Sequence, residues 1–448
     1  MKVIIIGCTC AGMVAANQIL KEQPTTEVTL YDQHAVIPSL PTDYSMFGPA
    51  DFTVSLPLLV PALGTDELMS AGAQIKTGSI IIGVDPKNKA VKVLDMLSDA
   101  QTVDHYDKLI IASDPRKIAP AIIGIDSNNV AQFSSQQDLR GLLASSFLDN
   151  QVIVAGNDPL SLGLVEAYRQ QKKDVTLILS GEPLLASYFA GEYSKRLAKI
   201  LEDSHVKVMN AQIESVADNG LGITVSTDQG EIAADKLAIS VAIKPDTDIY
   251  QGFLKLNADG TLVVNGLLQT SDENIYVAGG SAQIKFNPTG QNIYAPTLDT
   301  AARQALIVAA NITGKRVSDL GTQLSTSLSI CGTTMATVGL TFEAAKAAGL
   351  DADTVMIEDN YRPEFMPTNA SVLMSLVWNK DNQQILGAQL MSKHDVSQAI
   401  DLVSLCIQNK NTIEFLGMYD MMFQPNFDRT FNYINLLGQA AMVKAEQE

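Results

Sequence analysis

The first residues that could do chemistry form a glycine-rich turn close to the N-terminus. A β-branched run over 3–6 leads into the sequence GCTCAG at 7–12, and a helical pattern follows over 13–21. Backbone N–H groups at such a strand-to-helix turn can bind a pyrophosphate, and glycines let the backbone approach it closely. The strand predicted over 27–31 ends at Asp32, whose carboxylate could accept hydrogen bonds from a ribose. The pattern predicts a dinucleotide site; the alternative is a tight turn beside a surface acid.

A second strand–turn–helix–strand unit begins about one domain later. A strand over 151–155 ends at Gly156, a helix is predicted over 160–171, and a strand follows over 175–179. Its turn differs from the first, because Asp158 places a carboxylate where a pyrophosphate would come close, and like charges repel. This segment therefore predicts a Rossmann-like unit with a degenerate dinucleotide site.

Further strands and helices complete the architecture. Buried strands are predicted over 106–113, 236–241 and 274–277. Beyond about residue 320 the sequence pattern changes. Strands are predicted over 371–378 and 384–390, and helices over 394–409 and 412–419. We therefore expect an α/β chain with two Rossmann-like dinucleotide-binding domains and a C-terminal α+β domain.

Composition narrows the class of protein. The 448 residues carry a net charge of −18, which repels phosphate backbones and anionic lipid, so neither nucleic acid nor membrane is an expected partner. The N-terminal apolar run is too short for a signal peptide, and no stretch is long and apolar enough to span a bilayer. Four cysteines and four histidines are too scattered for a disulfide framework or a metal cluster. We expect a cytoplasmic protein without a metal site.

The order of these units resembles that of the pyridine nucleotide-disulfide oxidoreductases, in the branch that contains NADH oxidase, NADH peroxidase and coenzyme A-disulfide reductase. The turn at 7–12 is similar to the branch's GCTHAG, and IKFNP at 284–288 to its IKYNP. LGAQLMSK at 386–393 and FQP at 423–425 resemble its dimerisation domain. The resemblance covers essentially the whole chain. It implies FAD and NADH as cofactors and a homodimer formed through the C-terminal domain.

The resemblance also implies domain boundaries and cofactor contacts. It divides the chain into an FAD-type domain over 1–114 and 246–318, an inserted NAD-type domain over 115–245, and a C-terminal dimerisation domain over 319–448. The residues at FAD positions are Gly7, Thr9, Cys10, Ala11, Gly12, Asp32, Gln33, Thr42, Ser113, Gly279 and Gly280. The residues at NAD positions are Gly156, Asp158, Leu160, Leu179, Tyr188 and Ala242.

Several of these positions depart from the family pattern. Thr42 falls where the family has its redox Cys, and a hydroxyl cannot cycle between thiolate and sulfenate. Gly280 replaces an Asp that binds the ribityl chain of the flavin. In the NAD-type turn only Gly156 survives of three glycines, Pro159 removes an N–H donor, and Leu179 stands where an acid would bind a ribose. We therefore expect weakened FAD binding and no NADH binding in the usual mode.

Cys10 stands where the family has its acid/base His, and two interpretations are open. In the first, Cys10 is a relocated thiol near the flavin, with a pKa lowered by the helix N-terminus. In the second, it is a small buried residue that packs under the turn, as free cysteines commonly are.

Three functions are compatible with these residues. The first is a divergent FAD-linked oxidoreductase that passes electrons directly from flavin to oxygen or to a small acceptor. The second is a catalytically inactive paralogue that acts as a nucleotide-binding sensor or as a partner subunit. The third keeps redox chemistry but places it at Cys10.

Overall fold

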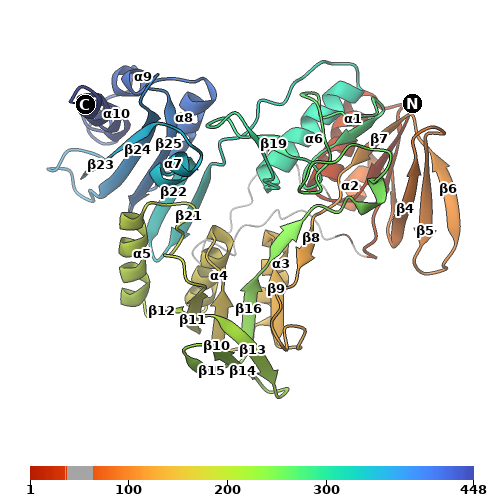
Figure 1. The fold of residues 1–448 in the computed structure, drawn as a ribbon, viewed down its shortest axis with the longest axis horizontal. Coiled ribbons are helices and arrows are strands. Elements are labelled where there is room, and N and C mark those ends of the chain that lie inside the picture. Colours follow the sequence, from red (N-terminus) through yellow and green to blue (C-terminus); the bar gives the residue numbers. More distant parts are fainter. Residues whose placement is uncertain (36, 38–63, 448) are drawn as a thin grey trace.

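Three five-stranded sheets organise the chain in the computed structural model, which describes residues 1–35, 37 and 64–447. Figure 1 shows the sheet that contains β7 (Lys108–Ile111) at the N-terminal end of the molecule, the sheet that contains β10 (Gln151–Ala155) below the centre, and the sheet that contains β25 (Ile385–Ser392) at the C-terminal end. The predicted fold class, two Rossmann-like units followed by an α+β domain, is confirmed.

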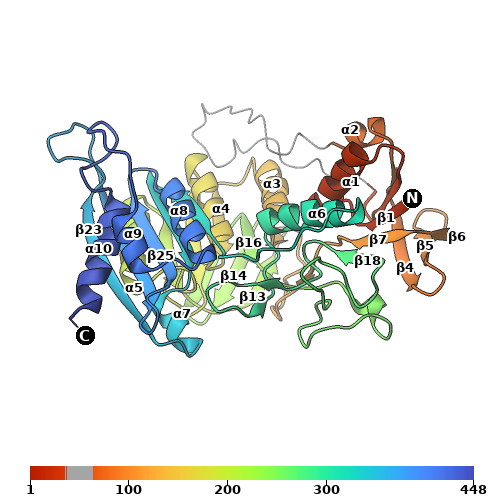
Figure 2. The same cartoon turned by 90° about the horizontal axis from the view of Figure 1, so that it is seen from above.

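The first unit is a parallel sheet in the order β18-β7-β1-β2-β3. Its strands are β1 (Lys2–Ile6), β2 (Glu27–Tyr31), β3 (Ala73–Lys76), β7 (Lys108–Ile111) and β18 (Ile275–Val277). Two helices, α1 (Cys10–Glu22) and α6 (Leu298–Ile312), lie side by side on one face (Figure 2). The other face is covered by an antiparallel sheet of β4 (Ser79–Asp85), β5 (Ala90–Asp95) and β6 (Gln101–His105). A short helix, α2 (Thr65–Ser70), packs beside β3.

Strand β1 shows why this sheet is buried on both faces. Val3 and Ile5 pack with α1 and α6, whereas Ile4 and Ile6 pack with β4 and β5. Successive side chains of a strand point to opposite faces, so a continuous β-branched run fits a strand covered on both sides. All four side chains are at most 9% exposed. This burial fixes the end of β1, and therefore the glycine turn, relative to α1.

The second unit repeats this plan. Its parallel sheet has the order β12-β11-β10-β16-β9, formed by β9 (Val130–Phe133), β10 (Gln151–Ala155), β11 (Asp174–Leu179), β12 (Lys207–Asn210) and β16 (Lys236–Ser240). One face carries α3 (Gln136–Ser145), α4 (Pro159–Gln170) and α5 (Gly191–Asp203). The opposite face carries an antiparallel sheet of β13 (Ile213–Asp218), β14 (Ile223–Thr227) and β15 (Gly230–Ala234). The chain passes between the two units through paired β8 (Arg116–Ile118) and β17 (Ala242–Lys244).

The C-terminal sheet is antiparallel, in the order β21-β22-β25-β24-β23. Its strands are β21 (Thr326–Ile330), β22 (Thr333–Gly339), β23 (Ala352–Asn360), β24 (Ser371–Asn379) and β25 (Ile385–Ser392). Helices α8 (Ser397–Gln408), α9 (Ile413–Met418) and α10 (Tyr433–Ala445) cover one face. The other face packs against α4 and α5 of the second unit (Figure 1). The remaining short elements are β19 (Ile284–Lys285), β20 (Asn292–Ile293), α7 (Phe342–Ala347) and a 3₁₀ turn over Asp248–Tyr250.

The structure also shows what the sequence pattern missed. The two three-stranded sheets, β4-β5-β6 and β13-β14-β15, were not expected. Their outer strands β6 and β15 are largely exposed, although β4 contains a run of three isoleucines. Helix α1 begins at Cys10 rather than at residue 13, because Thr9 is the N-cap and the helix starts before the apolar periodicity does. None of the helices in the described ranges is long and apolar enough to cross a membrane.

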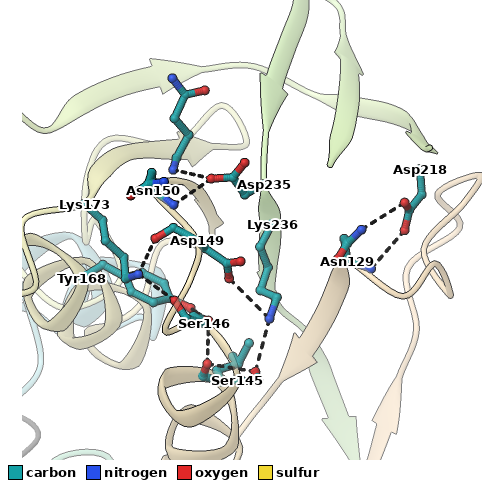
Figure 3. Close-up of polar contacts among 12 residues, drawn as sticks. Asn129, Ser145, Ser146, Asp149, Asn150, Tyr168, Lys173, Asp218, Asp235 and Lys236 are labelled. Atoms are coloured by element: carbon teal, nitrogen blue, oxygen red, sulfur yellow. Dashed lines mark hydrogen bonds and ion pairs between the residues drawn. The ribbon is translucent and has the colours of Figure 1, made fainter. Parts of the chain in front are cut away.

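A polar cluster joins α3 to the amino ends of the strands in the second unit (Figure 3). Lys236 forms an ion pair with Asp149 at 3.5 Å and donates to Ser145 Oγ at 3.2 Å. Asp235 accepts from the backbone N–H groups of Asn150 and Gln151, at 2.7 and 2.9 Å. Ligands of such sheets bind at the opposite, carboxyl ends of the strands, so this cluster is a structural support.

We expect Lys236→Gln to destabilise the second unit. Lys236 and Asp149 are 11% and 19% exposed, so losing the ammonium leaves a mostly buried carboxylate without its ion-pair partner. The expected loss is about 1 kcal/mol, which corresponds to roughly 2–4 °C in melting temperature. Lys92→Gln, which removes an exposed ammonium on β5, is the control. Equal melting temperatures for the two variants would contradict a supporting role for Lys236.

Candidate functional site

The first glycine turn brings three backbone segments into close contact. Gly7 has φ of +106°, and a Cβ there would lie 2.5 Å from the carbonyl oxygen of Ala112. A Cβ on Gly12 would lie 2.0 Å from the carbonyl oxygen of Gly7. Neither position can therefore hold a side chain without moving the backbone. Thr9 Oγ1 ties the turn together, since it donates to the Ala112 carbonyl at 2.7 Å and accepts from the Gly12 N–H at 3.2 Å.

This arrangement leaves the N-terminus of α1 open to an anion. Thr9, the N-cap, is neutral and takes only the Gly12 N–H. Among the described residues, no group accepts a hydrogen bond from the N–H of Cys10 or of Ala11. Unpaired N–H groups at the start of a 13-residue helix, together with the positive end of its dipole, form an anion site.

Asp32 lies at the end of β2, where the sequence predicts a ribose-binding acid. Its carboxylate is 9% exposed and accepts from the backbone N–H of Cys8 at 2.7 Å. The other carboxylate oxygen accepts from the backbone N–H of His34 at 2.9 Å and lies 2.8 Å from His34 Nδ1. Asp32 is therefore held against the turn, while its Cys8-bonded oxygen keeps lone-pair capacity for a further donor. The neighbouring Gln33 is exposed.

Gly279 marks the point where two helix N-termini meet. It has φ of +85°, and a Cβ there would lie 3.3 Å from Ala301 Cβ in α6 and 3.5 Å from Ala11 Cβ in α1. Its N–H is held by Gln304 Oε1 at 2.9 Å. The N-cap of α6, Thr297, makes no side-chain capping bond, so this helix also presents uncapped N–H groups. Two positive helix ends therefore converge on one place, as an extended anionic cofactor requires.

Gly280, where the family resemblance implies an Asp, is constrained by Pro115. A Cβ at position 280 would lie 2.6 Å from Pro115 Cδ, so a larger side chain has no room there unless the proline moves. The Gly280 carbonyl accepts from the Tyr294 hydroxyl at 3.0 Å, and Ser113 Oγ lies 3.1 Å from Ser281 Oγ. Pro115 therefore keeps the residue at position 280 small.

The environment of Cys10 does not favour a thiolate. Burial, followed by the negative charge of Asp114, raises the pKa of the Cys10 thiol to about 11. This direction is opposite to the lowering expected of a reactive thiol at a helix N-terminus. Cys10 also packs at the edge of the apolar core formed by β1, α1 and α6. The structure therefore favours the interpretation of Cys10 as a packing residue.

Asp114 is a functional candidate that the sequence analysis missed. Surrounding protein and the nearby carboxylate of Asp32 raise the pKa of Asp114 from 3.8 to about 6, although its side chain is solvent-accessible. It directly follows Ser113 at the carboxyl end of β7, the edge at which ligands of such sheets bind. The sequence signal was available, because an acid stands directly after a predicted FAD-contacting residue.

In the second glycine turn, the carboxylate of Asp158 occupies the start of the helix that follows. Asp158 is the N-cap of α4, and its Oδ1 accepts from the Ser161 N–H at 2.9 Å. Its Oδ2 accepts from the hydroxyls of Ser161 and Ser240, both at 2.8 Å. Pro159 at the first helical position has no N–H to offer. A negative group therefore already occupies the place where α4 could bind a phosphate.

The other predicted NAD-type residues are spread around this turn. Gly156 has no room for a side chain, because a Cβ would meet Ser161 Oγ at 2.2 Å. Leu179 is buried in the core, and Tyr188 and Leu160 pack at its edge. Ala242 is exposed at the start of β17. The turn is further tied down by the unpredicted Asn157 and Ser240: the Asn157 side chain bonds the backbone of 183 and 185, and Ser240 bonds Asp158.

Two further expectations from the sequence concern Thr42 and metal binding. Thr42, at the family's redox Cys position, lies outside the described residues. No group of three or more His, Cys, Asp or Glu side chains in the described part of the chain is placed to hold a metal ion.

Comparison with known proteins places the chain in a class. A model of the pyridine nucleotide-disulphide oxidoreductases matches residues 1–305, and a model of the dimerisation domain of the same proteins matches residues 325–433. The chain belongs to the pyridine nucleotide-disulphide oxidoreductase family, as the sequence resemblance implied. FAD and NADH are the cofactors of this family.

Several proteins that are similar to this chain are NADH oxidases. An NADH oxidase of Enterococcus faecalis is 34% identical, with 99% of each chain covered, and one of Streptococcus pyogenes is 29% identical over 98% of this chain and 99% of its own. The structure of the water-forming NADH oxidase from Lactobacillus brevis bound to NADH is 38% identical, with a TM-score of 0.92 and coverage of 100% of this chain and 99% of that one. A persulfide reductase from A. fulgidus, 24% identical with a TM-score of 0.91, shares the fold.

We expect Asp114→Asn to stabilise the protein more at neutral than at acidic pH. A carboxyl whose pKa is raised from 3.8 to about 6 binds a proton in the folded state that it has lost in the unfolded state, so its charge increasingly opposes folding as pH rises between these values. The melting temperature of the variant relative to the unchanged protein should therefore rise from pH 4 to about pH 6.5 and level off above. Asp203→Asn, at an exposed position on α5, is the control. The same difference at every pH would rule out a perturbed Asp114.

Proposed function

We propose that this chain is a divergent flavin-dependent oxidoreductase that binds FAD in its first unit and passes electrons from the flavin directly to oxygen or to a small acceptor. The observation that carries this proposal is the convergence of the α1 and α6 N-termini at Gly279, beside an uncapped pair of N–H groups. A dinucleotide carries two phosphates, and helix ends of this kind are suited to hold them.

The residues of the first glycine turn and Asp32 have separate roles in binding FAD. The N–H groups of Cys10 and Ala11 bind the diphosphate, and Asp32 accepts from ribose hydroxyls. Gly7 and Gly12 let the diphosphate reach the backbone. When bound, FAD supplies two-electron chemistry. With Thr42 at the family's Cys position and a protonated Cys10, the protein supplies no thiol relay, so hydrogen peroxide is the expected oxygen product.

The second candidate function is a catalytically inactive paralogue that senses a nucleotide or serves as a partner subunit. Asp158 is the observation that favours it, because a capping carboxylate at the start of α4 opposes the pyrophosphate of NADH, the donor of the family. Position 280 supports the same function, because Pro115 leaves no room there for a side chain that could bind the flavin. FAD binding would therefore be weaker.

Three further properties complete the proposal. The match to a dimerisation domain over 325–433 supports a homodimer formed through the C-terminal domain. The domain boundaries follow the sheets, since each five-stranded sheet draws its strands from one of the proposed ranges: 1–114 with 246–318, 115–245, and 319–448. The four cysteines, all of them free, support a cytoplasmic protein.

The freshly purified protein is expected to show a flavin absorbance band at close to one FAD per chain. Gly12→Ala should abolish FAD binding, because its Cβ would lie 2.0 Å from the Gly7 carbonyl oxygen. Asp32→Asn, which keeps the shape of the side chain, should weaken FAD binding about tenfold. Gly141→Ala, at an exposed helical glycine with nothing near its Cβ, is the matched control.

Anaerobic titration of the flavin-loaded protein with NADH then tests for catalysis. Bleaching of the flavin band by NADH, followed by peroxide formation on admission of air, would support the oxidoreductase. A colourless protein that does not take up added FAD would sink the flavin proposal and leave the inactive paralogue as the explanation.

Asp158→Ser should increase the affinity for NADH by about tenfold, because it removes one like charge from the start of α4. Serine also caps helices well, so the melting temperature should change little. The hydroxyls of Ser161 and Ser240, which now bond Asp158, would be free to donate to a phosphate. NADH fluorescence titration measures the change, with Asp203→Ser as the charge-matched control. Unchanged NADH binding in Asp158→Ser would show that the carboxylate is not what closes this turn.

A further inference from the structure

A cavity of about 590 Å³ lies where α5 of the second unit meets one end of the C-terminal sheet. Arg196 and Ile200 of α5 form one wall, and Glu358 of β23 and the segment from Ser392 to His394 at the end of β25 form another. Figure 1 shows α5 beside this end of the sheet, far from the first glycine turn. Cavities of about 300–1,000 Å³ are typical of small-molecule sites, so its size suits a ligand as large as a nucleotide.

The walls of this cavity are held in place by contacts between the two domains. Arg196 forms a two-pronged ion pair with Glu358, both N–O distances being 2.9 Å, and a further bond of 3.1 Å with Glu192. The Tyr193 hydroxyl, one turn earlier on α5, donates to the Gln389 carbonyl of β25 at 2.8 Å. These contacts preorganise the cavity and leave Arg196 balanced by carboxylates.

Lys393 is a cation in the cavity lining whose side chain is available to a ligand. Its side chain is exposed, and none of the described residues forms an ion pair or hydrogen bond with its ammonium. Arg196 is paired with both Glu358 and Glu192, so Lys393 is the cation of the lining that no described carboxylate pairs. A lone cation in such surroundings favours an anionic ligand.

His394 offers a flat surface to the cavity. Its ring stacks on Tyr361, with centroids 3.9 Å apart and planes inclined by 5°. Tyr361 is 8% exposed and Arg362 lies over its ring at 5.1 Å, so the half-buried imidazole is the accessible ring of the pair. Burial lowers the pKa of His394, against the opposing effect of Asp395, and this direction favours the uncharged ring. A neutral aromatic ring is a suitable stacking surface for a nucleobase.

We propose that this cavity binds a mononucleotide, with its phosphate on Lys393 and its base stacked on His394. Thr333 and Thr368 in the lining have hydroxyl protons that none of the described groups accepts, so they can donate to the ribose or the phosphate. The Ser392 hydroxyl already donates to the Ser371 carbonyl. Because the walls belong to the second unit and to the C-terminal domain, the ligand bridges the two. This site is independent of the proposed flavin site and uses none of its residues.

Calorimetric titration of the full-length protein with AMP, adenosine and inorganic phosphate tests the proposal, run with and without saturating FAD. AMP is expected to bind in both conditions, about tenfold more tightly than adenosine, which lacks the charge for Lys393. Lys393→Gln should weaken AMP binding about tenfold and leave adenosine binding unchanged. His394→Ala should weaken both ligands, since both have a base to stack.

Lys92→Gln, which removes one exposed ammonium from β5 at the far end of the molecule, is the matched control and should bind AMP like the unchanged protein (Figure 1). AMP binding that is lost when FAD is present, or that neither Lys393→Gln nor His394→Ala weakens, would place the nucleotide at a glycine turn and overturn the proposal. Absence of AMP binding to the unchanged protein would overturn it as well.

Discussion

The start of a helix offers a few unpaired N–H groups and a positive dipole end, and one negative group can fill that place. The two units of this chain use it in opposite ways. In α1 the neutral Thr9 takes a single N–H and leaves the place open, whereas in α4 the carboxylate of Asp158 occupies it. The units therefore share a topology and differ in the charge at this helix start.

The close packing of the backbone around the start of α1 is explained by the same need to expose unpaired N–H groups. A diphosphate can reach the N–H groups of α1 only if no side chain stands between, and Gly7, Gly12 and Gly279 meet that condition. At Gly280 the space for a side chain is filled by Pro115, whose Cδ lies 2.6 Å from where a Cβ would stand. A change at one of these two positions therefore constrains the other.

The C-terminal sheet ties the second unit to the rest of the chain. It is covered by α8, α9 and α10 on one face and by α4 and α5 on the other, so few of its side chains are left to solvent. The buried Tyr193 bonds across this junction, and Arg196 pairs with Glu358 at its edge. The cavity lined by Arg196 and His394 lies at this junction, and domain interfaces are common places for ligand sites.

The sequence by itself determined the two glycine turns, the strands and helices around them, the family, and the charge at Asp158, because these depend on local periodicity and on residue type at a few neighbouring positions. Only the tertiary structure decided what those residues touch. The third bond of Asp158 comes from Ser240, 82 residues away, and the partner of Gly280 is Pro115. The raised pKa of Asp114 and the stacking of His394 on Tyr361 also arise between distant segments. Strand register and helix packing bring such pairs together, and no local pattern in a single chain encodes them.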